Sequence, residues 1–177
     1  MWSLTPSVVV ILLCTCISQT TGALRTLQCS EQTAPAVAFY AYISQNFRAL
    51  SARRTFVFDA VETNIGKGYN RRTGIFTAPS SGVFAFSWTI HAAGVHLAGS
   101  SGQYGETAGV IVQNGVAKGS IYADTEKKYD DAASTGFVIL HVKRGDRIQI
   151  VAPRTGQGAF YSTSYNGRTS FAGYRIA

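Results

Sequence analysis

The sequence predicts an all-β domain, a sandwich or closed barrel of roughly eight to ten short strands. Residues 83–91 alternate between bulky and smaller side chains, which is the pattern of a strand that buries one face. Ten Phe, nine Tyr and eighteen Gly against a single Met favour strands and tight turns over helices. Asn114-Gly115, set between two apolar stretches, is typical of a two-residue hairpin turn.

The first half of the domain offers strands separated by breakers. They are expected at Val37–Ile43, Phe56–Phe58 and Gly74–Thr77, and a long strand runs from Val83 toward Gly94. Residues 64–70 are rich in Asn and Gly, which tolerate a left-handed backbone, and residues 78–82 combine Pro, Ser and Gly. Alternation on the long strand places one row of side chains on the same face: Phe84, Phe86, Trp88 and Ile90.

The second half continues in the same way. Five further strands are expected, at Tyr104–Gln113, Val116–Tyr122, Gly136–Val142, Arg147–Val151 and Thr169–Ile176. The apolar Gly136–Val142 is expected to be a buried strand. A charged loop covers Asp124–Asp131, and Lys143–Gly145 forms a tight turn. Pro153–Arg168 is the longest stretch without strand alternation, so a loop is expected there.

The N-terminus predicts a secreted, extracellular protein without a membrane span. Residues 1–23 are expected to be a signal peptide, residues 24–35 a leader and residues 36–177 one globular domain. The apolar run Val8–Cys14 is too short to span a bilayer, and the small residues at 21–23 suit cleavage before Leu24. A retained membrane anchor is the alternative. The leader has no Gly-X-Y repeat, so no collagen stalk is expected.

Cys29 is the one cysteine that remains once Cys14 and Cys16 leave with the signal peptide. In the oxidising environment outside the cell, an odd cysteine indicates an interchain disulfide or a reactive thiol. A tail thiol with no structural role is the alternative.

The charge of the chain points to anionic partners. The formal net charge is +7, and no charged residue precedes Arg25. A basic surface attracts nucleic acid, anionic lipid or acidic glycans. Because the sequence has no dense Lys/Arg block and no nucleic-acid motif, acidic glycans are the expected partners and nucleic acid is not.

The spacing of aromatic and turn residues from position 58 to 88 resembles the signature of the C1q globular-head family, which includes the cerebellins, adiponectin and many secreted invertebrate proteins. The positions that carry the resemblance are Phe58, Asn64, Tyr69, Phe76, Gly82, Phe84, Phe86 and Trp88. The family usually has Tyr at position 84 and Phe or Tyr at position 88, so both departures keep an aromatic ring. Thr169–Tyr174 resembles the family's closing strand and Lys143–Arg147 its Gly-Asp turn.

This resemblance implies a ten-stranded jelly-roll sandwich of the C1q and tumour necrosis factor type. It also implies a homotrimer, with apolar side chains buried along its axis and three copies of any site. Asp124 matches a position where some members ligate calcium near that axis, so calcium is the one cofactor suggested. Because Lys127 and Lys128 lie among the neighbouring acids, a solvated loop is the alternative.

Residues 154–168 combine flat aromatic side chains, hydroxyl groups and two arginines. Aromatic faces meet the C–H surface of a sugar, and arginine grips a carboxylate such as that of sialic acid. The candidate glycan-binding residues are Arg154, Gln157, Tyr161, Tyr165 and Arg168. The alternative is an ordinary polar loop in which Phe160 or Tyr161 packs inward.

No catalytic residues are assigned, and no enzyme activity is expected. The sequence has no G-x-S-x-G, no H-E-x-x-H and no phosphate loop. His91 and His96, five residues apart on one strand, would face opposite sides and could not share a metal. Residues 144–146 spell the Arg-Gly-Asp integrin tripeptide, but a tight turn between two apolar strands explains the same residues.

These features favour a secreted, trimeric pattern-recognition lectin of the stalkless invertebrate C1q type, which binds sialylated or microbial glycans in innate immunity. Single sugar sites are weak, and three copies on one particle raise avidity. The rival hypothesis is a protein-binding module of the cerebellin type, an extracellular organiser or adaptor that recognises a protein receptor. A third, a metal-binding or mineral-associated protein, rests on the acidic loop alone.

Overall fold

The computed structural model describes residues 35–48, 50–94, 101–126 and 129–177. The chain divides between residues 34 and 35 into two units, and the described residues all belong to the second. The expected signal peptide, Cys29, His96 and Lys127–Lys128 lie outside the described residues, so the predictions on them stay predictions.

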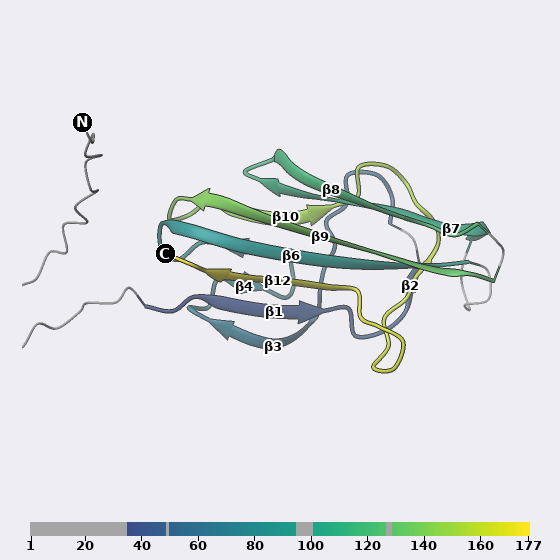
Figure 1. Cartoon of the computed structure of the whole chain (residues 1–177), viewed down its shortest axis with the longest axis horizontal. Coiled ribbons are helices and arrows are strands. Elements are labelled where there is room, and N and C mark those ends of the chain that lie inside the picture. Colours follow the sequence, from purple (N-terminus) through teal and green to yellow (C-terminus); the bar gives the residue numbers. More distant parts are fainter. Residues whose placement is uncertain (1–34, 49, 95–100, 127–128) are drawn as a thin grey trace, which may run out of the picture. The chain divides into compact units, whose positions relative to one another are not determined.

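The described residues form two antiparallel sheets packed face to face, which confirms the predicted jelly-roll sandwich (Figure 1). One sheet contains, in spatial order, β3 (Ala60–Ile65), β1 (Ala38–Tyr42), β12 (Ser170–Arg175), β6 (Gly82–Ala93) and β9 (Asp131–Val142). The other contains β4 (Tyr69–Asn70), β5 (Ile75–Thr77), β10 (Arg147–Val151), β7 (Ser101–Gln113) and β8 (Val116–Asp124).

A short strand, β11 (Gln157–Phe160), joins the two sheets. Its first two residues pair with β7 and its last two with β6, and β2 (Phe47–Arg48) adds to its end. β11 lies inside the stretch expected to be a loop. That stretch shows no alternation because β11 passes from one sheet to the other, and its last three residues are all buried.

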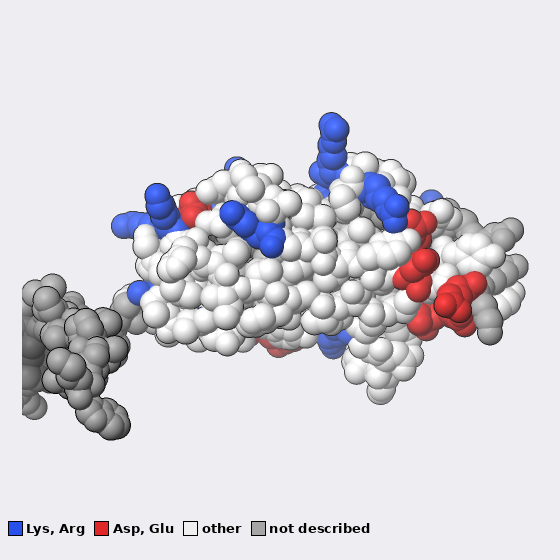
Figure 2. All heavy atoms as spheres, turned by 45° about the horizontal axis from the view of Figure 1, so that its top comes forward, with Lys and Arg blue, Asp and Glu red and all other residues white. Residues whose placement is uncertain are grey.

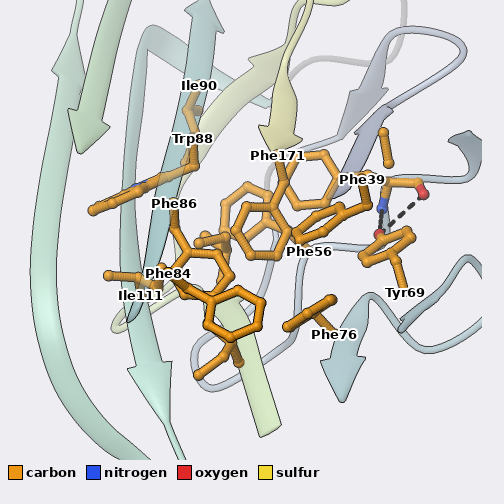
Figure 3. Close-up of a cluster of buried hydrophobic side chains, with 14 of the residues drawn as sticks. Phe39, Phe56, Tyr69, Phe76, Phe84, Phe86, Trp88, Ile90, Ile111 and Phe171 are labelled. Carbon is orange, nitrogen blue, oxygen red and sulfur yellow. Dashed lines mark hydrogen bonds between the residues drawn. The ribbon is translucent and has the colours of Figure 1, made fainter. Parts of the chain in front are cut away.

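The core between the sheets is largely aromatic (Figure 3). The predicted row on β6 is confirmed, since Phe84, Phe86, Trp88 and Ile90 are each at most 1% exposed. From the opposite sheet, the Phe76 ring lies 5.8 Å from that of Phe84 and 5.7 Å from that of Phe86. Full burial of one such side chain contributes roughly 1.5–3 kcal/mol to stability, so this row of rings holds the sheets together.

One polar group is held inside this core, and it explains part of the sequence signature. The Tyr69 hydroxyl donates to the Phe58 carbonyl (3.0 Å) and accepts from the Phe58 amide (3.2 Å) (Figure 3). Burial raises the pKa of Tyr69 well above its ordinary value, so it stays a neutral donor. The Asn64 side chain bonds to the Tyr69 backbone at both its amide and its carbonyl. The spacing of these three residues therefore fixes one turn against the core.

The prediction of a strand at Phe56–Phe58 was wrong. Both rings are fully buried, but the backbone here pairs with β10 at an isolated bridge, Thr55 to Val151, and through single hydrogen bonds such as that from the Phe56 amide to the Ile150 carbonyl. The Phe58 backbone bonds to the Tyr69 side chain instead of to a neighbouring strand. β3, which follows directly, was not predicted, because its polar sequence AVETNI lacks alternating bulky residues.

The prediction that Gly136–Val142 is buried was also wrong. The strand, β9, starts earlier at Asp131, and its side chains alternate in exposure. Phe137 is 60% exposed and Ile139 57% exposed on the outer face of the sheet. On the inner face, Gly136 lies against the Trp88 indole, where an added Cβ would come within 2.4 Å of the ring. The apolar run therefore combines a core face with an uncovered apolar outer face.

The tight turns formed as predicted. Asn114 and Gly115 both have positive φ, 52° and 83°, and connect β7 to β8. At the next turn, the Asp146 carboxylate accepts bonds from the Lys143 amide and from the side chains of Gln113 and Asn114. The Asp146 carboxylate thus bonds to both turns, the one at Asn114-Gly115 and the one at Lys143–Gly145. This is expected if the Arg-Gly-Asp tripeptide serves to form the turn.

Candidate ligand-binding site

The segment 153–168, which carries all five candidate glycan residues, runs along one end of the sandwich from β10 to the hairpin before β12 (Figure 1). Because β11 passes from one sheet to the other in the middle of this segment, the candidates fall into two groups. Arg154 and Gln157 lie beside β7. Tyr161, Tyr165 and Arg168 follow β11 on the side of β6 and β12.

At the first group, Glu106 of β7 holds both candidates. Its carboxylate lies 2.7 Å from the Arg154 guanidinium and accepts a bond of 3.2 Å from the Gln157 amide. The Arg154 guanidinium also lies 4.9 Å from the centre of the Tyr122 ring on β8. Partial burial, and then the hydrogen bond and charge of Glu106, raise the pKa of Tyr122. An anionic ligand would have to displace Glu106 before it could pair with Arg154.

At the second group, residues 163–167 form a small hairpin that presents Arg168. Thr163 and Gly167 pair across it, and the backbone N–H of Asn166 donates to the Thr163 hydroxyl. The Arg168 guanidinium lies 3.7 Å from the centre of the Tyr42 ring on β1, a cation–π contact. The Tyr42 hydroxyl donates to Glu62 (3.1 Å). No carboxylate of the described residues forms an ion pair with Arg168.

The two tyrosines of this group differ in exposure. Tyr165, at the hairpin tip, is 93% exposed, whereas Tyr161 is 8% exposed. The Tyr161 hydroxyl accepts a bond from the Asn166 side chain, and its carbonyl accepts one from Thr169 (2.8 Å). Phe160 and Tyr161 thus pack inward, and Tyr161 can serve a ligand only by holding Asn166 in place.

His91 of β6 supports the hairpin from behind. An added Cβ on Gly167 would lie 2.4 Å from the His91 ring, so the imidazole rests directly on the hairpin backbone. Burial lowers the pKa of His91, against the opposing effect of Asp131. The imidazole is therefore neutral near pH 7 and supplies packing at this position.

Figure 2 shows Asp and Glu side chains gathered near one end of the described domain. Asp124, the predicted calcium ligand, is the last residue of β8. It stands opposite Glu106 in the β7–β8 register and is exposed, and Asp130 and Asp131 lie where β6 meets β9. Within the described ranges, no three His, Cys, Asp or Glu side chains are arranged to hold a metal ion. Calcium at Asp124 stays a prediction.

Three neighbours of the candidate residues were not anticipated: Tyr42, Glu106 and Tyr122. Each lies on a strand far away in the sequence, and only the register of those strands brings it to the segment. The alternation of Tyr40 and Tyr42 on an expected strand was the one available signal, because it placed two tyrosines on the same outer face.

Comparison with known proteins identifies the domain. The C1q domain profile matches residues 38–176. The collagen alpha-1(X) chain of Mus musculus is 29% identical over 143 residues, which cover 81% of this chain and 19% of that one. Complement C1q tumor necrosis factor-related protein 3 of Mus musculus is 28% identical over 140 residues, covering 79% and 51%. The chain thus spans about half or less of the length of these curated relatives.

Solved structures agree on the fold. The globular domain of zebrafish complement 1qA is similar with a TM-score of 0.56 and 15% identity, over 81% of this chain and 98% of that one. Eiger, a tumour necrosis factor from S. frugiperda, gives a TM-score of 0.57 and 14% identity, over 81% and 94%. At such identities the likeness concerns the jelly roll alone.

Proposed function

The chain belongs to the C1q domain family, and on that premise we propose that it is a secreted, homotrimeric recognition protein that binds sialylated or microbial glycans. We place the sugar at the second group of candidate residues, on the hairpin that carries Tyr165 and Arg168. Arg168 would pair with the carboxylate of sialic acid, and the Tyr165 ring would lie against the C–H face of the sugar.

The observation that carries this proposal is the environment of Arg168. Its guanidinium is oriented by the Tyr42 ring, yet no carboxylate of the described residues pairs with it. A planar fork of donors held in one orientation suits a bidentate carboxylate and loses little entropy when it binds. The exposed tyrosine three residues earlier supplies the flat surface that a sugar ring needs.

A trimer is supported by the outer face of β9. Phe137 and Ile139 stand side by side on this face, both more than half exposed, with no cover among the described residues. Large exposed apolar side chains in a row mark contact surfaces. If three subunits cover this row, each particle carries three hairpins, and three weak sugar sites bind a glycan-coated surface with useful avidity.

Secretion and the absence of catalysis complete the proposal. The signal peptide expected at residues 1–23 supports export. In the part of the chain that the structure describes, no helix is long and apolar enough to cross a membrane. Neither group of candidate residues brings a nucleophile together with a base, so we propose binding without chemistry.

The rival function, a protein-binding module that recognises a receptor, is favoured by one observation. In the first candidate group, Glu106 already neutralises Arg154, which leaves a surface of mixed charge with an exposed Tyr122. Such a mixture of aromatic and paired charged groups suits a protein partner as well as a sugar.

A glycan array probed with the purified protein, with and without calcium, tests the proposal. We expect binding to sialylated or microbial glycans, with sialylated signals lost in Arg168→Ala and kept in Arg154→Ala. An empty array together with capture of one saturable protein receptor would replace the lectin by the rival function. Light scattering on the same sample should give three subunits, and Phe137→Asp should give one.

A further inference from the structure

The domain has a cavity of about 350 Å³ between the end of β1, β2 and residues 54–59, and Phe160 is the one residue of the glycan segment in its lining. Its floor is buried and apolar: Ile43, Phe56 and Phe160 are 7%, 0% and 0% exposed. This volume falls within the range of sites that hold small molecules.

The walls of the cavity are apolar but open to solvent. Phe47 is 53% exposed and Val57 39% exposed, and both line the cavity together with the partly buried Leu50. Exposed apolar side chains that surround a hollow with an apolar floor are typical of a ligand site. The hydrophobic effect would favour an apolar ligand here over water.

The rim of the cavity determines the charge of that ligand. Arg54 lines the cavity, and no acidic side chain of the described residues forms an ion pair with it. The one acidic residue in the lining, Asp59, already accepts bonds from the Ser44 amide (2.9 Å) and hydroxyl (2.6 Å). Asp59 is thus held by Ser44, whereas Arg54 is the cationic side chain in the lining and has no carboxylate partner among the described residues. Its guanidinium is available to an anionic group of a ligand.

We propose that this cavity binds an amphipathic carboxylate, such as a medium-chain fatty acid. The alkyl chain lies against Phe47, Leu50 and Val57, and the carboxylate pairs with Arg54. This site goes beyond the proposed glycan binding and does not depend on it, because Arg168 is not among the lining residues.

Calorimetry with octanoate, decanoate, decanol and decylamine tests this site. We expect decanoate to bind more tightly than octanoate, by about fourfold for each added CH₂. Arg54→Gln should weaken decanoate about tenfold and leave decanol unchanged. The matched variant Arg53→Gln, at a neighbour outside the cavity lining, should leave both affinities unchanged.

A second pair of variants tests the cavity itself. Val57→Trp should fill it and abolish binding of both decanoate and decanol, while Val116→Trp, on the exposed β7–β8 hairpin, should not. Thermal unfolding of each variant shows whether the domain still folds. The proposal is overturned if decanoate does not bind, if decylamine binds as tightly, or if Arg168→Ala weakens decanoate as it weakens sugar.

Discussion

Arg154 and Arg168 stand at opposite ends of one segment, and each places its guanidinium over a tyrosine ring. Arg154 lies 4.9 Å from the centre of the Tyr122 ring and Arg168 lies 3.7 Å from that of Tyr42. They differ in what else they contact. Glu106 pairs with Arg154 at 2.7 Å, whereas no carboxylate in the described part of the chain pairs with Arg168. Arg154 is therefore paired within the fold, whereas the Arg168 guanidinium is available to pair with an anionic ligand.

This difference shows that residue type alone does not identify a ligand site. A guanidinium can pair with the carboxylate of an anionic sugar only where no carboxylate of the chain already forms an ion pair with it. The neighbouring strands decide this, since Glu106 reaches Arg154 through the pairing of β7 with β11. On this ground we propose that an acidic sugar would bind at the Arg168 end.

The largest expected effect separates the two arginines directly. Arg168→Ala should weaken binding of sialyllactose by about tenfold to a hundredfold, because a charge-assisted bidentate bond to the sugar carboxylate is lost. Arg154→Ala should change the affinity less than about threefold. Isothermal titration of both variants measures this.

Arg168→Lys serves as a control for charge. It keeps the positive charge but lacks the planar fork, so its affinity should fall between those of the original protein and Arg168→Ala. Equal losses in Arg154→Ala and Arg168→Ala would contradict the assignment to one end.

A smaller effect is expected at the support of the hairpin. Tyr161→Phe removes the hydroxyl that accepts a bond from Asn166 and should weaken sugar binding about fivefold, with a loss of about 1 kcal/mol in the free energy of unfolding. Tyr174→Phe, at an exposed position on β12, is the matched control and should change neither value. Unaltered binding in Tyr161→Phe would show that the sugar does not need an anchored Asn166.

Freeing Arg154 from its ion pair with Glu106 should raise the affinity for sialylated glycans modestly. Glu106→Gln removes the carboxylate that holds Arg154 and should raise affinity for sialylated glycans by up to about fivefold, because a second arginine becomes available. The pKa of Tyr122 should fall, since both the hydrogen bond and the charge of Glu106 raise it in the native protein. Calorimetry and ultraviolet titration of Tyr122 measure the two changes; a drop in affinity would count against this interpretation.

The smallest expected effect is a pH dependence confined to the hairpin end. Burial lowers the pKa of His91 below its ordinary 6.5, so the unfolded chain takes up this proton more readily than the folded chain. Its contribution to stability is present above about pH 6.5 and is lost as the pH falls through the lower folded-state pKa. Thermal unfolding between about pH 7 and about pH 5 should show this loss, and His91→Gln should reduce it. The pKa values of Asp59 and Asp146 are lowered from 3.8, so their contributions are lost only in more acidic solution.

Much of the fold followed from local patterns. The alternation from Phe84 to Ile90 identified the core row, and Asn114-Gly115 identified a turn that needs two positive φ angles. Local patterns predicted the wrong structure where contacts with residues distant in the sequence determine the backbone conformation. The apolar residues Phe56–Phe58 predicted a strand, and both rings are buried, yet the Phe58 backbone bonds to the Tyr69 hydroxyl and not to a neighbouring strand.

Less of the candidate site than of the fold could be predicted from the sequence. The composition of residues 154–168 predicted a glycan site in this segment, and that site stays a prediction; composition could not separate Arg154 from Arg168. That separation depends on Glu106 and Tyr42, which lie about fifty and more than a hundred residues away along the chain and approach only through strand pairing. The burial of Tyr161 likewise depends on how residues 163–169 fold back and bond to it through Asn166 and Thr169, which residue type alone does not reveal.

The most direct test of the central claim is a titration of the isotope-labelled protein with sialyllactose, followed by nuclear magnetic resonance. Glycan recognition at the hairpin predicts saturable shifts of the signals of Tyr42, Tyr165, Asn166 and Arg168, with the signals of Glu106 and Tyr122 unchanged. Shifts confined to Glu106 and Tyr122, or no shifts at all, would contradict it.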